Sequence, residues 1–112
     1  MTSMVIIGAG PGGYEAASVA AAGGVEVTVV EETGIGGAAV LTDCVPSKTL
    51  IATAEVTSTL RRAAELGLRH TETFEVDLDA VNSRVRQLAQ AQSDDISRGL
   101  ERKGVRLISG RA

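Results

Sequence analysis

The chain has 112 residues, which corresponds to one globular domain, and its 44% hydrophobic and 22% charged residues are typical of a soluble protein. The net charge of −3 argues against nucleic acid or an anionic membrane surface as a partner. A single cysteine, Cys44, and a single histidine, His70, exclude an internal disulfide and a cysteine-rich zinc site, and no metal site is expected. We expect His70 to be an exposed loop residue.

The N-terminal third predicts one βαβ unit. Residues 4–7 are an apolar run, which indicates a strand buried on both faces of a parallel sheet. The glycine-rich residues 8–13 follow as a loop, and the alanine-rich residues 14–22 predict a helix that stops at the glycines 23–24. Residues 25–30 are mostly β-branched and predict a second strand, parallel to the first through a right-handed crossover.

Two longer helices and a strand are predicted to follow. A helix over residues 46–66 begins at a proline, which is favoured at the first helical position, and stops at Gly67. A third helix has Asp77 as its N-cap and ends at Gly104, before a strand over residues 105–109. The expected fold class is therefore α/β, a Rossmann-like βαβ fold with a parallel sheet and two long antiparallel helices. The apolar residues expected to face the core are Leu50, Ile51, Ala54, Leu60 and Ala64 on the second helix and Val81, Val85, Leu88, Ile96 and Leu100 on the third.

The loop after the first strand carries the pattern Gly8-x-Gly10-x-x-Gly13. In a dinucleotide site, Gly8 allows the tight turn, Gly10 lets a pyrophosphate approach the backbone, and Gly13 lets the helix pack on the strand. The anion is then bound by the free N–H groups of the helix. Glu31 follows the second strand, where a carboxylate binds ribose hydroxyls and repels a 2′-phosphate, which favours FAD or NAD over NADP. The alternative is a βαβ turn without a ligand.

A second segment of interest runs from Gly36-Gly37 to Lys48. Cys44 lies just before the predicted second helix, where the helix dipole favours a thiolate. Lys48 follows one turn later and projects from the same side. These residues indicate a redox site, but they fit equally well a small buried cysteine and an exposed lysine. The residues alone leave both interpretations open.

Over nearly its whole length, the chain resembles the flavoprotein (pyridine nucleotide) disulfide reductase family, through Gly8-Ala9-Gly10-Pro11-Gly12-Gly13-Tyr14, Glu31, Gly36-Gly37 and Cys44-Val45-Pro46-Ser47-Lys48. In that family, the first motif binds the FAD pyrophosphate, the acidic residue binds the adenosine ribose, and the lysine lies close to the reactive nitrogen of the flavin. The resemblance implies a redox position for Cys44 and Lys48. It implies FAD binding by Gly8, Gly10, Pro11, Gly12, Gly13, Glu31, Glu32, Gly36, Gly37, Lys48 and Ala112.

One departure from the family concerns the redox disulfide. The family pattern G-G-x-C-x-x-x-x-C-x-P-S-K has two cysteines, whereas this chain has Ala39 at the first position and only Cys44 at the second. A dithiol–disulfide cycle needs two sulfurs within bonding distance, so disulfide reductase activity is not expected. Electrons would leave the flavin for a diffusible acceptor such as a quinone. The segment resembles an actinobacterial branch of lipoamide-dehydrogenase-like NAD(P)H quinone reductases.

The resemblance also implies a larger protein. Residues 1–112 would be the N-terminal part of an FAD-binding domain, without the nicotinamide-binding and dimerisation domains, so the isolated chain is expected to be inactive. The full-length protein would be a homodimer that takes electrons from NADH or NADPH. The alternatives are a dihydrolipoamide dehydrogenase-like protein, a fragment of an NAD-linked dehydrogenase, and a non-catalytic dinucleotide-binding module. A cytoplasmic protein is expected, because the chain shows neither a targeting signal nor an apolar run long enough to span a membrane.

Overall fold

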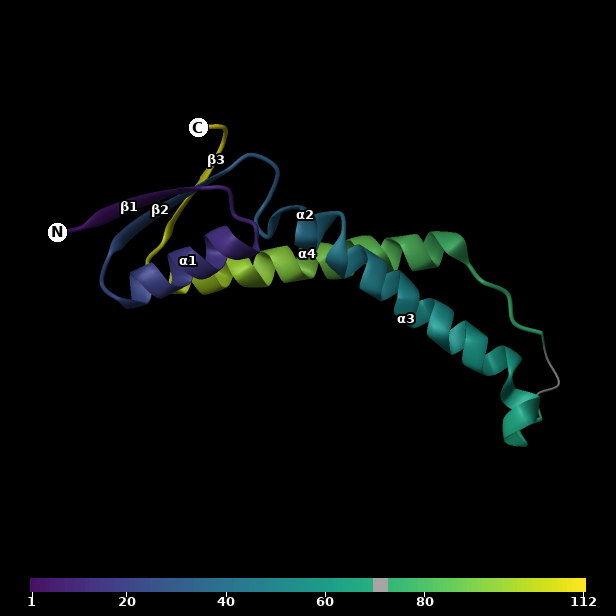
Figure 1. Ribbon diagram of the computed structural model, residues 1–112. Helices are drawn as coiled ribbons and strands as arrows, with labels where there is room; N and C mark the ends of the chain where they lie inside the picture. The colour runs from purple at the N-terminus through teal and green to yellow at the C-terminus, as the bar shows by residue number, and fades with distance from the viewer. Residues whose placement is uncertain (70–72) are drawn as a thin grey trace.

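The computed structural model describes residues 1–69 and 73–112, so His70 lies outside the described residues. A parallel sheet occupies one end of the molecule, and two long helices extend from it, giving overall dimensions of 67 × 25 × 18 Å (Figure 1). None of the described helices combines the length and apolar character needed to cross a membrane. In chain order the elements are β1 (Ser3–Ile7), α1 (Pro11–Ala22), β2 (Glu26–Glu31), α2 (Gly37–Leu41), α3 (Cys44–Arg61), the 3-10 helix η1 (Ala63–Leu66), α4 (Leu78–Arg102) and β3 (Arg106–Ser109).

The sheet has the order β1-β2-β3 with all strands parallel, which confirms the predicted α/β class and the βαβ unit. Both crossover helices, α1 and α4, lie on the same face of the sheet (Figure 1), as right-handed crossovers in one direction require. On that face, the β-branched side chains of Val27 and Val29 in β2 are 1% and 0% exposed. The core is built from small aliphatic side chains, namely Ala9, Ala17, Val27, Val29, Leu100 and Val105.

The prediction that the first strand is buried on both faces is wrong for this chain. Val5 and Ile7 are 66% and 72% exposed, whereas Ile6 between them packs against the core, so the two exposed residues belong to the face of the sheet opposite α1 and α4. Within residues 1–69 and 73–112, no helix packs on that face of the sheet, and β1 is an edge strand. The described part of the chain therefore buries only some of the apolar side chains of β1.

Helix α1 begins at Pro11, three residues earlier than predicted, so part of the glycine-rich segment is itself the first helical turn. Proline suits this position because its fixed φ is helical and its missing N–H has no partner there. Gly8 turns the chain with a φ of +93°, which favours glycine. A Cβ on Gly13 would lie 1.9 Å from the carbonyl oxygen of Gly8, so α1 and the loop meet at a distance that only glycine allows.

The boundaries of the second long helix also differ from the prediction. Helix α3 begins at Cys44, and Pro46 is its third residue rather than its first. The N–H groups of a first helical turn have no intrahelical partner, so proline is tolerated at this position as well. The α-helix ends at Arg61, and the predicted last turn is instead the 3-10 helix η1, which Gly67 terminates with a φ of +76°.

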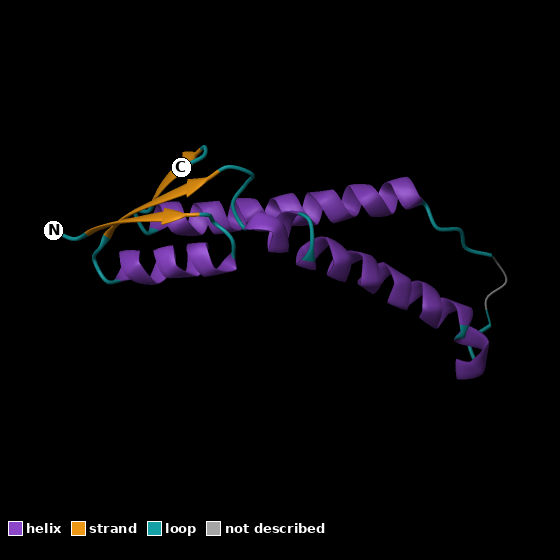
Figure 2. Ribbon diagram, turned by 45° about the horizontal axis from the view of Figure 1, so that its top comes forward, coloured by secondary structure: helices purple, strands orange, loops and turns teal. Residues whose placement is uncertain are grey.

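The two long helices are antiparallel, as predicted, but they diverge away from the sheet (Figure 2). The predicted apolar stripe of α3 is wrong, because Leu50, Ile51 and Leu60 are 51%, 55% and 42% exposed. A helix that leaves its neighbour at an angle buries little of its apolar face. In α4, the predicted core residue Leu88 is 40% exposed, and the buried positions are Ala89, Ser93 and Leu100.

The start of α4 agrees with the prediction. The Asp77 carboxylate accepts a hydrogen bond of 2.9 Å from the backbone N–H of Ala80 and thereby caps the helix. At the other end, Gly104 has a φ of +79°, and β3 begins two residues later. The N-cap signal in the sequence therefore located this boundary correctly.

We predict that Gly13→Ala destabilises the chain by about 2 kcal/mol or more, because the new methyl group meets a backbone carbonyl that cannot move freely. Gly12→Ala is the matched control, since a Cβ there meets no atom within 4 Å and alanine favours a helix. Urea unfolding followed by circular dichroism measures both variants. Equal stabilities of the two variants would contradict the close approach of α1 to Gly8.

Candidate functional site

A pocket of about 300 Å³ lies at the carboxyl ends of the strands, where parallel sheets bind their ligands. Two backbone hydrogen bonds of 2.8 Å organise this edge: Gly8 N–H donates to the carbonyl of Val30, and Gly110 N–H donates to that of Glu31. The pocket thus brings together residues 7–8, residues 30–33 at the end of β2, and the C-terminal residues 110–112. Its lining includes four of the predicted site residues, Gly8, Glu31, Glu32 and Ala112, together with Ile7, Val30, Thr33, Gly110 and Arg111.

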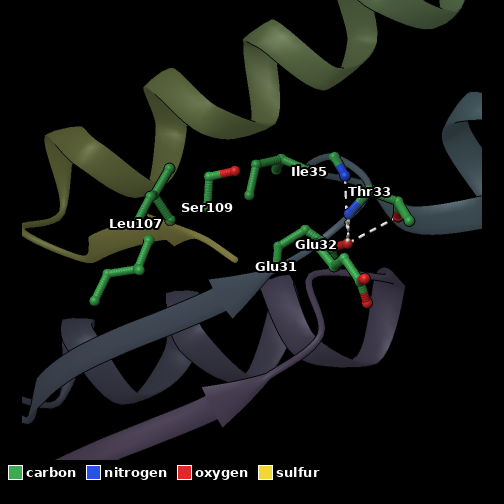
Figure 3. Close-up of a pocket in the computed structure, with 8 residues that line it drawn as sticks. Glu31, Glu32, Thr33, Ile35, Leu107 and Ser109 are labelled. Carbon is green, nitrogen blue, oxygen red and sulfur yellow. Dashed lines mark hydrogen bonds between the residues drawn. The ribbon is translucent and has the colours of Figure 1, made fainter. Parts of the chain in front are cut away.

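The carboxylate of Glu31 is held by backbone and side-chain donors from two loops. Its Oε2 accepts a 2.7 Å hydrogen bond from the Ala9 N–H. Its Oε1 accepts bonds of 2.7 and 2.8 Å from the N–H and hydroxyl of Thr33, and one of 3.3 Å from the Gly34 N–H (Figure 3). The Ala9 bond is the main reason that the pKa of Glu31 is lowered to about 2, and burial acts in the opposite direction. Glu31 is therefore ionised at neutral pH.

A second pocket of about 290 Å³ adjoins the first at Glu31, Glu32 and Thr33. It lies between β3 and the loop after β2, and Ile35, Leu107 and Ser109 line it (Figure 3). Glu31 therefore lines both pockets.

The glycine loop leaves space beside its backbone. Gly10 is the N-cap of α1 with a φ of −68°, a conformation that any residue adopts, and a Cβ on it would meet no atom within 4 Å. Neither backbone strain nor packing within the described chain explains a glycine here. Helix α1 also has no side-chain cap and no acidic residue in its first turn, so its N–H groups are available to an anion. These features fit the pyrophosphate of a dinucleotide.

The second glycine segment packs directly against the first. Gly36 N–H donates a 2.8 Å hydrogen bond to the carbonyl of Ala9. A Cβ on Gly37 would lie 2.9 Å from the Cα of Gly10, and both Gly36 and Gly37 have positive φ, of +100° and +60°. The structure therefore brings the predicted residues Gly36 and Gly37 to the same loop cluster as Gly8 and Gly10.

The predicted redox residues lie outside this pocket. Cys44 and Lys48 are exposed in the first turns of α3, and neither lines the pocket at Glu31. Ala39 lies in α2, a short helix that the sequence analysis missed. The two glycine segments and Glu31 thus lie together at the carboxyl ends of the strands. Cys44 and Lys48, which were predicted to act beside the flavin, lie in α3.

Sequence reasoning missed Ala9 and Thr33, the partners of Glu31. Thr33 had no established signal, because the turn in which a side chain accepts from the N–H two residues later is formed by Asp and Asn, whereas residue 31 is a glutamate. Ala9 had no signal either, because its N–H donates to a residue that is distant in the sequence.

The geometry of Glu31 predicts a pH-dependent contribution to stability. Since the folded-state pKa of about 2 is below the ordinary value of 4.5, this contribution is fully present above about pH 4.5 and is lost as the pH falls towards 2. We predict that Glu31→Gln lowers the free energy of unfolding at pH 7 by about 1–3 kcal/mol, because an amide N–H₂ replaces an oxygen that accepts backbone hydrogen bonds. The difference from the unaltered chain should narrow between pH 4.5 and 2 in denaturant titrations.

Glu26→Gln provides the control, because it makes the same change of charge at the exposed opposite end of β2. Its effect at pH 7 should stay within about 0.5 kcal/mol. If the two variants lost equal stability at pH 7, the loop contacts of Glu31 would not be the cause.

Comparison with known proteins is consistent with this geometry. A family model described as pyridine nucleotide-disulphide oxidoreductase matches residues 2–112. NAD(P)H dehydrogenase (quinone) of Mycobacterium tuberculosis is 50% identical over 115 residues, covering 99% of this chain and 23% of that protein. Dihydrolipoyl dehydrogenase of Chlamydia muridarum is 36% identical over 107 residues, covering 96% of this chain and 23% of that protein.

Two solved structures share the fold. The crystal structure of LpdA from Mycobacterium tuberculosis matches with a TM-score of 0.92 at 49% identity and covers 99% of this chain and 24% of that one. RclA from Escherichia coli, an HOCl-induced flavoprotein disulfide reductase, matches with a TM-score of 0.76 at 22% identity, covering 100% of this chain and 22% of that one.

The similarity extends over the whole of this chain but over a limited part of each relative. The chain spans 23% of the length of the two curated relatives described above. Those relatives are named as oxidoreductases, and the predicted resemblance to the flavoprotein disulfide reductases is confirmed. By the match over residues 2–112, this chain belongs to the pyridine nucleotide-disulphide oxidoreductase family.

Proposed function

We propose that residues 1–112 form the N-terminal part of the FAD-binding domain of an NAD(P)H-dependent flavoprotein oxidoreductase that reduces quinones. The observation that carries this proposal is Gly10, whose missing side chain leaves open space in front of the uncapped N-terminus of α1. A pyrophosphate placed there would accept hydrogen bonds from the free N–H groups of the first helical turn. The name of the relative at 50% identity, NAD(P)H dehydrogenase (quinone), supports the choice of activity.

The proposed contacts of the adenosine half follow from the pocket at Glu31. A carboxylate has about four acceptor positions, so Oε2, which accepts one protein hydrogen bond, can also accept from a ribose hydroxyl. The loop amides hold this carboxylate ionised and fixed, which lowers the entropy lost when the sugar binds. In this proposal, Gly8, Gly10, Pro11, Gly12 and Gly13 surround the pyrophosphate, Gly36 and Gly37 support it, Glu31 and Glu32 face the ribose, and Ala112 faces the adenine.

The charge of Glu31 also bears on the choice of dinucleotide. A carboxylate with a pKa of about 2 is negative throughout the physiological range and repels a ribose 2′-phosphate. FAD carries no such phosphate, and its adenosine suits this pocket. Bound FAD would supply the redox chemistry, by accepting a hydride from NADH or NADPH and returning two electrons to an acceptor.

The residues near the flavin are proposed to be Lys48 and Cys44, both in the first turns of α3. Lys48 would place a positive charge beside the reactive end of the flavin, and Cys44 would lie there as a single thiol. Because Ala39 provides no second sulfur, the exchange of electrons with a substrate disulfide has no route through this segment. The flavin itself would therefore pass electrons to a diffusible acceptor, for which a quinone is our candidate.

A dihydrolipoyl dehydrogenase is the second candidate, because relatives with that name are 36% identical to this chain. The alanine at position 39 argues against it, since the lipoamide reaction requires the dithiol. The Cys44–Lys48 segment likewise argues against a fragment of an NAD-linked dehydrogenase. Flavin bound to the purified protein would argue against that alternative too. It would also argue against a non-catalytic module that binds another dinucleotide.

We predict that Gly10→Ala weakens FAD binding by about tenfold or more while the chain stays folded, because the methyl group occupies the space proposed for the pyrophosphate. Gly99→Ala in α4 is the matched control, since its nearest neighbour is a flexible arginine side chain at 3.9 Å. Flavin content after purification and quenching of flavin fluorescence on titration measure binding, and thermal unfolding measures folding. Unchanged FAD affinity in Gly10→Ala would refute the proposed pyrophosphate site beside Gly10.

We predict that the complete protein, loaded with FAD, oxidises NADH or NADPH with a quinone as acceptor and gives only background turnover with lipoamide. The reason is the single sulfur at Cys44. A dihydrolipoyl dehydrogenase with both cysteines provides the positive control for the lipoamide assay. Robust lipoamide turnover would overturn the role assigned to Ala39 and leave the FAD proposal intact.

A further inference from the structure

A buried hydroxyl on α4 reaches the loop beside Glu31. Ser93 is 5% exposed, and its Oγ donates a 2.6 Å hydrogen bond to the backbone carbonyl of Ile35. In the described part of the chain, Ser93 is the one polar residue classed with the buried core. No motif predicted this contact, which joins residues far apart in the sequence. A buried polar group that is fully paired fixes the parts it connects.

The loop that receives this bond has an unusual backbone. Ile35 stands between Gly34 and Gly36, whose φ angles are +143° and +100°, and Gly37 follows with +60°. Glycine loses more conformational freedom on ordering than any other residue, so a loop with three such positions depends on outside contacts to keep one conformation. The side chain of Ile35 packs against the core, and its carbonyl is held by Ser93.

From this loop, hydrogen bonds continue to the dinucleotide residues. Gly36 N–H donates to the carbonyl of Ala9 at 2.8 Å, and Ala9 N–H donates to the carboxylate of Glu31 at 2.7 Å. Gly34 N–H donates to the other oxygen of the same carboxylate at 3.3 Å. Ser93 therefore supports a loop that donates directly to one oxygen of the Glu31 carboxylate and that contacts Ala9, the donor to the other oxygen.

We propose that Ser93 is a positioning residue for dinucleotide binding: its hydroxyl fixes the second glycine loop, residues 33–37, and through that loop the carboxylate of Glu31. This inference rests on the proposed function in taking FAD as the ligand. The role also makes α4 part of the site, although α4 contributes no residue to the lining of the pocket at Glu31. Removal of the hydroxyl leaves the Ile35 carbonyl without its partner and releases the loop.

The test compares Ser93→Ala with Ser97→Ala. The Ser97 hydroxyl is also partly buried on α4, but it donates within the helix, to the carbonyl of Ser93 at 2.9 Å. We expect Ser93→Ala to accelerate amide hydrogen exchange in residues 33–37 and to raise the Kd for FAD about tenfold, while the variant still folds and unfolds cooperatively at a somewhat lower temperature. Ser97→Ala should do neither, and Ser93→Thr, which keeps a hydroxyl, should restore slow exchange and FAD affinity.

The outcomes separate this inference from the proposed function. Unchanged exchange in residues 33–37, or unchanged FAD affinity in a folded Ser93→Ala variant, would overturn the inference while the unaltered protein still binds FAD. Failure of Ser93→Ala to fold would also overturn it, because the hydroxyl would then support the whole fold. If the unaltered complete protein bound no FAD, the proposed function would fail, and the exchange data would report on the loop alone.

Discussion

The hydrogen bonds to the carboxylate of Glu31 are the constraint on which the site depends. A single side chain at the end of β2 accepts from Ala9 in the first glycine loop and from Thr33 and Gly34 in the second glycine loop, residues 33–37. Both loops are rich in glycine and therefore need several such contacts to keep one conformation. The ionised carboxylate stabilises the two loops in one arrangement, and the same charge favours a ribose with free hydroxyls over one that carries a phosphate.

Glycine serves two separate purposes in this arrangement. At Gly13 it permits contact within the protein, since any Cβ would meet the Gly8 carbonyl, and at Gly37 it permits the approach of the second segment to Gly10. At Gly10 it serves no contact within the described chain, and the open space there fits a ligand. This difference separates a glycine required for folding from one that is explained by binding.

The distribution of exposed apolar residues is consistent with a chain that spans 23% of the length of its relative at 50% identity. The uncovered face of the sheet carries Val5 and Ile7, and the divergent helix α3 exposes Leu50 and Ile51. Neighbouring exposed aliphatic side chains of this kind are more typical of a surface that another part of a protein covers than of a surface that faces solvent. The hydrogen bonds that connect the loops at the carboxyl ends of the strands come from residues of this chain.

Four features could be predicted correctly from the amino-acid pattern: the α/β class, the βαβ unit, the N-cap at Asp77 and the position of Glu31 at the end of the second strand. These features depend on local backbone preferences and on periodic patterns, which short segments contain in full. Three others became visible only in the folded chain: the exposure of the apolar residues of α3, the bond from Ala9 to Glu31, and the bond from Ser93 to Ile35. Such contacts join segments distant in the chain, and a hydroxyl or a backbone N–H carries no local signal of the partner that packing brings to it.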